Sequence, residues 1–113
     1  ILKANFQKIF ENQWNLHKNE LKELYGFESY VAVRTNGTVE TKNIDDYSQS
    51  GKGGLKIIFY DETEKPVAFM WMRGSGTEPV FRVMCDVKGN KPKEEQKLLE
   101  WETKMILRAD SLA

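Results

Sequence analysis

The chain has 113 residues, which is enough for one domain with a single hydrophobic core. Its 17 Lys and Arg side chains balance its 17 Asp and Glu side chains, so no long-range attraction to nucleic acid or to an anionic membrane is expected. The single cysteine, Cys85, excludes an internal disulfide, and neither a signal peptide nor an apolar run long enough to cross a membrane is visible. We therefore expect a cytoplasmic protein.

The first predicted element is a helix over residues 5–25, with Asn5 as its N-cap and Gly26 ending it in the left-handed conformation. Because the chain begins at Ile1 rather than Met, we expect a piece of a longer polypeptide, in which residues 1–26 link the preceding part to a compact domain at 27–113. Apolar residues recur at spacings of three and four and form one stripe, with the lone histidine packed beside it: Phe6, Ile9, Phe10, Trp14, His17, Leu21 and Leu24.

Residues 30–35 are apolar and β-branched enough to predict a strand, and Asn36-Gly37 after it is a hairpin signal because both residues tolerate positive φ. Residues 38–41 could form a short return strand, although they are poorly apolar. The polar stretch 42–54 is expected to be an exposed connection. Its Gly51-Lys52 pair lacks the spacing and the following helix of a nucleotide-phosphate loop, so we do not expect nucleotide binding there.

Three strands are predicted over residues 55–60, 67–72 and 80–87, with a polar turn at 61–66 between the first two. Cys85 lies in the middle of the third strand, where a buried and inert thiol is expected. A helix follows, with Asn90 as N-cap and an apolar stripe for burial: Leu98, Trp101, Met105, Ala109 and Leu112. These elements predict an α+β domain, an antiparallel four-stranded sheet with two helices packed on one face.

The loop between the last two predicted strands has a distinct chemistry. Arg73 offers a planar guanidinium that can pair with two phosphate oxygens at once, and Ser75 and Thr77 offer hydroxyls. Gly74 and Gly76 allow unusual backbone angles and leave the main-chain N–H groups open to an anion. The loop could therefore hold a phosphate group. A Gly-Ser-Gly tract is also common in simple turns, and this alternative stays open at the level of composition.

Arg82 lies a few residues beyond this loop, on the side of its strand that alternates with Phe81 and Val83. Two interpretations are equally supported by the sequence. Arg82 is either a surface arginine paired with a carboxylate or a weaker contributor near the ligand.

The run Arg73-Gly74-Ser75-Gly76-Thr77-Glu78-Pro79, followed by Val80-Phe81-Arg82-Val83, resembles the phosphate-binding signature of the C-terminal domain of the α-D-phosphohexomutases, the phosphoglucomutases and phosphomannomutases. The family pattern is Arg-x-Ser-Gly-Thr-Glu-Pro and then a strand with arginine in its third position, and every fixed position is present here. Gly74 stands where the family often has proline. The resemblance covers about residues 50–110, including the strand-like run 54–61 before the loop.

The resemblance implies a TATA-binding-protein-like fold and a role in an enzyme that interconverts hexose 1-phosphate and hexose 6-phosphate through a hexose 1,6-bisphosphate. In such enzymes the fourth domain binds the substrate phosphate that is not being transferred. By residue match, Arg73, Ser75, Gly76 and Thr77 are expected to contact that phosphate, with Arg82 as the weaker candidate. A hinge before Gly54 would let the domain close over the sugar.

The family's catalytic phosphoserine loop, magnesium loop and sugar-selecting loop are absent from this sequence. We therefore expect no catalytic residue and no metal ligand in this chain, no activity of the chain alone, and Mg²⁺ bound by another domain of the full enzyme. The implied partners are the phosphosugars and the other domains of that enzyme, and the identity of the hexose is left open.

Two further hypotheses belong to other classes of protein. The first is a free-standing module that binds a phosphorylated ligand through the same loop. The second is a nucleic-acid-binding sheet that uses Tyr60, Phe69, Trp71 and Phe81, which the neutral charge and the missing strand motif disfavour.

Overall fold

The computed structural model describes residues 2–36, 39–47, 53–74, 81–89 and 91–111. This part of the chain contains two helices and five strands, and the predicted α+β class is confirmed. The elements follow one another as α1 (Leu2–Tyr25), β1 (Ser29–Asn36), β2 (Val39–Lys42), β3 (Gly54–Tyr60), β4 (Pro66–Gly74), β5 (Phe81–Val87) and α2 (Pro92–Ser111).

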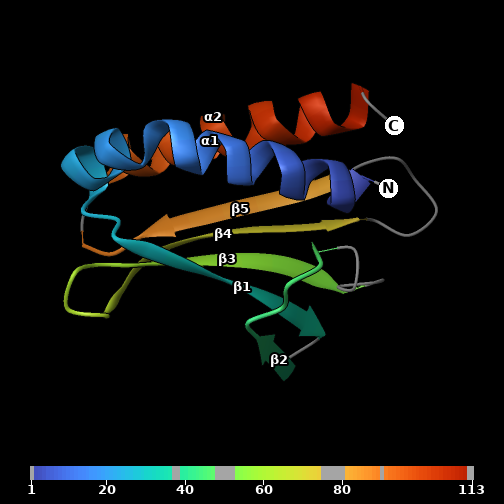
Figure 1. The fold of residues 1–113 in the computed structure, drawn as a ribbon, viewed down its shortest axis with the longest axis horizontal. Helices are drawn as coiled ribbons and strands as arrows, with labels where there is room; N and C mark the ends of the chain where they lie inside the picture. The colour runs from blue at the N-terminus through green and yellow to red at the C-terminus, as the bar shows by residue number, and fades with distance from the viewer. Residues whose placement is uncertain (1, 37–38, 48–52, 75–80, 90, 112–113) are drawn as a thin grey trace.

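The strands form one antiparallel sheet in the order β2-β1-β3-β4-β5 (Figure 1). The prediction of four strands is therefore wrong, because β2 adds a fifth. All four side chains of β2 are exposed, so no pattern of burial marks it as a strand. Backbone pairing with β1 makes it one, from Asn36 opposite Val39 to Val33 opposite Lys42. The hairpin signal falls at this junction, but Gly37 lies outside the described residues.

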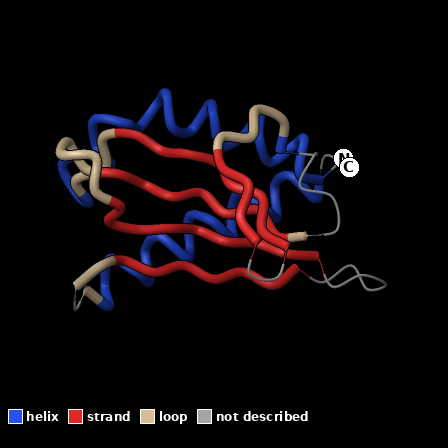
Figure 2. Tube along the Cα trace, turned by 90° about the horizontal axis from the view of Figure 1, so that it is seen from below, coloured by secondary structure: helices blue, strands red, loops and turns tan. Residues whose placement is uncertain are grey.

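Both helices lie on one side of the sheet, as predicted (Figures 1 and 2). We call this the helix side and the opposite one the open side. Side chains alternate between the two sides along each strand. On β3, for example, Leu55, Ile57 and Phe59 face the helices and are fully buried, whereas Lys56 and Tyr60 point to the open side and are only partly buried.

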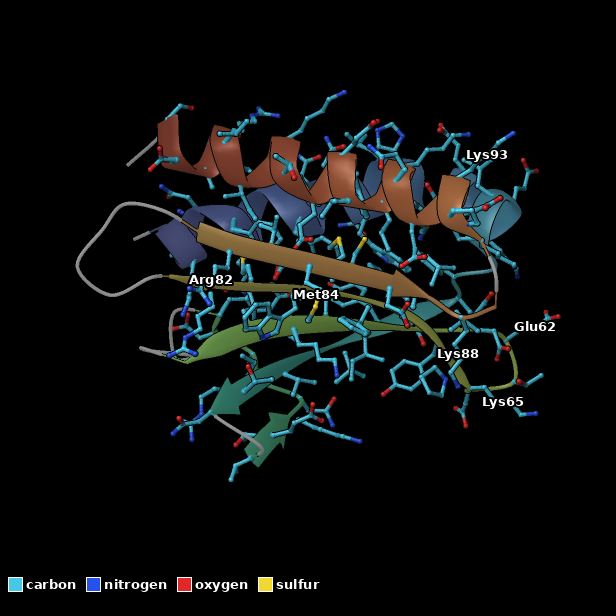
Figure 3. All side chains as sticks on the ribbon, turned by 180° about the vertical axis from the view of Figure 1, so that it is seen from behind. Glu62, Lys65, Arg82, Met84, Lys88 and Lys93 are labelled. Atoms are coloured by element: carbon cyan, nitrogen blue, oxygen red, sulfur yellow. The ribbon has the colours of Figure 1, made fainter. Side chains whose placement is uncertain are left out.

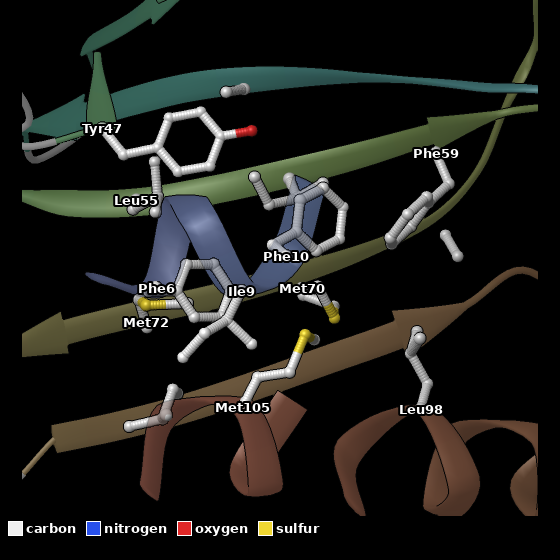
Figure 4. Close-up of a cluster of buried hydrophobic side chains, with 14 of the residues drawn as sticks. Phe6, Ile9, Phe10, Tyr47, Leu55, Phe59, Met70, Met72, Leu98 and Met105 are labelled. Atoms are coloured by element: carbon white, nitrogen blue, oxygen red, sulfur yellow. The ribbon is translucent and has the colours of Figure 1, made fainter. Parts of the chain in front are cut away.

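Aromatic contacts join the two helices to the centre of the sheet. The Phe10 ring of α1 lies 6.2 Å from the Phe59 ring of β3 and 5.8 Å from the Trp101 ring of α2, measured between centroids. Phe59 also stacks on Phe27 at 4.1 Å, with the two rings almost parallel. Figure 4 shows the surrounding apolar side chains, which come from α1, α2 and the strands: Phe6, Ile9, Leu55, Met70, Met72, Leu98 and Met105.

Helix α1 begins at Leu2, three residues before the predicted start, so Asn5 is not its N-cap. The Asn5 amide instead donates a hydrogen bond to the Ala109 carbonyl near the end of α2. The predicted end is confirmed, since Gly26 has φ of 77° and its N–H bonds the Lys22 carbonyl. The division of the chain at residue 26 stays a prediction, although α1 contributes to the same core as the strands.

The predicted turn at 61–66 is confirmed and is held by one carboxylate. Asp61 Oδ1 accepts hydrogen bonds from the backbone N–H groups of Thr63 and Lys65 and from the Thr63 hydroxyl. These bonds lower the pKa of Asp61 below its ordinary value. The turn keeps β3 and β4 adjacent and fixes which side of β4 faces the helices.

Candidate functional site

The predicted phosphate loop connects two neighbouring strands. β4 ends at Gly74 and β5 begins at Phe81, and these two residues are opposite one another in the antiparallel ladder. The predicted strands on both sides of the loop are thus confirmed. Ser75, Gly76 and Thr77 lie outside the described residues, so their contact with a phosphate stays a prediction.

Arg73 and Arg82 stand at the two ends of this loop and face each other across the strand pair. Arg73 follows Met72, which is buried on the helix side, and Arg82 precedes Val83, which packs against the same core. Alternation therefore directs both guanidinium groups to the open side. Both side chains are exposed. Figure 3 shows Arg82 at the end of β5 that is nearest the loop.

Neither guanidinium forms an ion pair or hydrogen bond with any residue that the structure describes. The interpretation of Arg82 as an arginine paired with a surface carboxylate therefore finds no support there. Two like charges directly opposite on one side of an antiparallel pair destabilise it. The sheet thus presents two adjacent cations at the loop, and an anion bound between them would relieve their repulsion.

The residues next to Arg73 are held firmly. The Trp71 indole N–H donates to the Thr35 hydroxyl at 3.1 Å, across the strand that separates β4 from β1. Gly54 lies beneath this bond, and a Cβ built there would stand 2.4 Å from both Trp71 Nε1 and Thr35 Oγ1. Only glycine leaves room for the indole at this point. The part of β4 that precedes Arg73 is therefore anchored on the open side.

A polar concavity of about 270 Å³ lies elsewhere, beside α1 and β1. Its lining includes the carboxylates of Glu11 and Asp45 and the phenols of Tyr30 and Tyr47. It holds no cationic side chain among its lining residues, so it does not suit a phosphate. This concavity could not be predicted from the sequence, because its walls come from three separate segments of the chain.

Glu102 of α2 was not among the residues predicted from the sequence to be buried. The side chain is fully buried, and neither carboxylate oxygen has a hydrogen-bond partner among the described residues. Burial raises the pKa of Glu102 to about 9, so the carboxyl is protonated at neutral pH. Its place in the chain could have revealed it, because position 102 falls on the stripe of Leu98, Met105 and Ala109.

Cys85 is partly buried and its thiol donates to the Glu95 carbonyl at 3.2 Å. Burial, and then the nearby Glu102 carboxylate, raise the pKa of this thiol to about 11. A thiol with so high a pKa is a poor nucleophile at neutral pH, which agrees with the expected inert role.

Comparisons with protein-family models, with curated proteins and with solved structures found no match to this chain. Within the described ranges, no helix is both long and apolar enough to span a bilayer. In the same ranges no group of three or more His, Cys, Asp or Glu side chains is arranged to hold a metal ion. The expectation that another domain of a longer enzyme binds Mg²⁺ stays a prediction.

Proposed function

We propose that this chain is the substrate-phosphate-binding C-terminal domain of a phosphohexomutase, with the TATA-binding-protein-like fold of that domain. The observation that carries the proposal is the pair Arg73 and Arg82. The two exposed guanidinium groups face each other on the open side, at the two ends of the loop whose sequence matches the family signature. A sheet with helices on one side and five antiparallel strands is compatible with that fold.

The proposed role is binding and not chemistry. A phosphate held by Arg73, the loop N–H groups and the hydroxyls of Ser75 and Thr77 anchors one end of the sugar. That binding energy helps to orient the other end toward a reactive centre supplied by other domains. We accordingly predict that the 113-residue chain alone has no mutase activity. Turnover that survives repurification would contradict this part of the proposal.

The test is an NMR titration of the isotopically labelled chain with glucose 1-phosphate, glucose 6-phosphate and glucose. Both phosphates are expected to shift the amide signals of residues 73–77 and 82, whereas glucose leaves them in place. Affinity is expected to be weak, because only one wall of the complete cleft is present. The Arg73→Ala variant should lose the response. The control is Arg34→Ala, which removes an exposed arginine of β1. Arg34 is opposite Leu55 and so lies on the helix side, away from the loop, and this variant should keep the response.

A free-standing module that binds a phosphosugar through the same loop is the alternative. Both proposals predict the same shifts in this titration. The two proposals differ when the chain is joined to the other domains of a mutase. Only a genuine mutase domain should lower the KM of that enzyme for hexose phosphate, compared with the same enzyme without the chain. An absence of shifts with either phosphate would refute both.

A further inference from the structure

Strand β5 forms one edge of the sheet. It is the last strand in the order β2-β1-β3-β4-β5, and no described residue pairs with its outer side. It has seven residues and contains neither proline nor lysine, which commonly protect an edge from pairing, and its two charged residues, Arg82 and Asp86, have opposite signs. Met84, in the middle of the strand, is 51% exposed. An edge of this length and composition is open to another strand.

The pairing of β5 with β4 determines which backbone groups of β5 point outward at this edge. The Lys88 N–H bonds the Val67 carbonyl of β4. The N–H and C=O groups of alternate residues point to the same side of a strand, so those of Asp86, Met84 and Arg82 point toward β4. Those of Val83, Cys85 and Val87 consequently point outward, where they can bond a further strand.

The outer edge is complementary to itself. Arg82, Met84 and Asp86 lie on the open side of β5 at successive alternate positions. An antiparallel copy of β5 related by a two-fold axis at Met84 would place Arg82 opposite the second copy's Asp86, and Met84 opposite its own equivalent. Val83 and Cys85, whose backbone groups point outward, would then exchange hydrogen bonds with Cys85 and Val83 of the other copy. We infer that β5 pairs in this way with a second copy of this chain to form a symmetric dimer.

This geometry satisfies the general conditions for a closed assembly. A two-fold axis perpendicular to the sheet uses the same surface on both copies and closes after two chains. Such an axis does not exchange the two faces of the sheet. The helices of both copies would therefore cover the same face of one continuous sheet. Arg82 and Asp86 bear opposite charges, and opposite charges directly across an antiparallel pair stabilise it.

The other edge of the sheet is less suitable. β2 has only four residues, and one of them is Lys42. The Glu40 carboxylate is already engaged by Lys56, with its Oε2 3.3 Å from Lys56 Nζ. A second copy would therefore find fewer backbone groups to bond at β2. The Glu40 carboxylate, being paired with Lys56, would also not be free to pair with a cation of the second copy.

Disulfide trapping tests the inferred register. In a Cys85→Ser background, Met84→Cys should cross-link to itself under mild oxidation, because Cα atoms of directly opposite residues at such positions are about 4.5 Å apart, within the range of disulfides. Arg82→Cys in the same background is the matched control. It would face Asp86 of the other copy and should not cross-link to itself, whereas a mixture of Arg82→Cys and Asp86→Cys chains should form the mixed dimer.

The charge pair provides the second measurement. Sedimentation should show a dimer at high concentration for the unmodified chain, a loss of dimer for Asp86→Arg and a recovery for the double variant Arg82→Asp/Asp86→Arg. Circular dichroism would verify that each variant is folded. A folded Met84→Cys chain that stays monomeric would overturn the inference, and so would Arg82→Cys chains that cross-link equally well. The Met84→Cys result would not bear on phosphate binding, since Met84 has no part in that site.

Discussion

The helix side and the open side of the sheet are built from alternate residues of the same strands, yet they differ in almost every respect. On the helix side Phe59, Met70 and Met72 are completely buried. On the open side Arg73, Arg82 and Met84 are exposed; the two arginines belong to the proposed ligand site, and Met84 and Arg82 to the proposed contact along the edge of β5. The contrast indicates that the helix side maintains the fold, whereas the open side is available for recognition.

The division is not absolute, and the exceptions are informative. On the open side, Val33 and Ile58 are buried although no helix covers them. Long side chains there also cover their neighbours, as when Lys56 Nζ lies 4.6 Å from the centroid of the Phe69 ring. On the helix side the exception is Glu102, a buried acid without a partner among the described residues. Substitutions on each side can therefore test the contrast.

The largest effect is expected from truncation on the helix side. Phe59→Ala removes a fully buried ring that stacks on Phe27 and should lower the free energy of unfolding by about 3–5 kcal/mol. Chemical denaturation measures this loss. The matched change on the open side, Met84→Ala, should alter stability by less than about 0.5 kcal/mol. Comparable losses for the two variants would remove the distinction between the sides.

A smaller effect is expected where the open side is tightly packed. Gly54→Ala places a methyl group against the Trp71 indole and the Thr35 hydroxyl and should cost about 1–3 kcal/mol. Trp71→Ala clears that space, so the two substitutions together should cost less than the sum of their separate effects. A double-mutant cycle by urea denaturation measures this coupling. Simple additivity would show that the indole does not lie over Gly54.

Glu102 predicts a dependence of stability on pH. Its pKa is about 9 in the folded chain and 4.5 ordinarily, so between these values the folded chain keeps a proton that the unfolded chain releases. Stability should therefore fall as the pH rises from about 4.5 to about 9, and Glu102→Gln should flatten this slope. Glu102→Met should raise the free energy of unfolding at neutral pH by about 1–3 kcal/mol, because no buried polar group is left unsatisfied. An unchanged slope in Glu102→Gln would show that this carboxyl is not the source.

The smallest effect on stability is expected at the proposed site itself. Arg73→Ala removes an exposed side chain without a partner among the described residues, so the free energy of unfolding should change by less than about 0.5 kcal/mol. Removal of one of two facing cations can even be slightly stabilising. Thermal denaturation without ligand measures this effect. A large loss of stability would indicate that Arg73 supports the fold, in contrast to the division between the two sides.

The sequence predicts most of this fold because the spacing of its apolar residues matches the pattern of burial in the strands and helices. Leu55, Ile57 and Phe59 alternate in the chain as they do in the sheet, and the stripes of both helices place most of their residues in the core. β2 could not be assigned in the same way, since its exposed residues become a strand only through backbone pairing. Leu24 fits the stripe of α1 but is 60% exposed, whereas the next residue, Tyr25, packs against the core.

Prediction of the candidate site was limited in a different way. The motif indicated Arg73, but only the register of β4 and β5 showed that Arg82 stands directly opposite. Pairing between strands cannot be read from either strand alone. Glu102 was missed because charged residues are usually assigned to solvent, even where their spacing places them on a buried stripe.

The most direct measurement is the spectrum of the arginine side chains. The chain contains four arginines, Arg34, Arg73, Arg82 and Arg108, so the guanidinium N–H region of an NMR spectrum is simple to assign. Addition of glucose 6-phosphate is predicted to shift the Arg73 and Arg82 signals and to leave those of Arg34 and Arg108 unchanged. Equal shifts of all four signals, or none at Arg73, would contradict the proposed phosphate site.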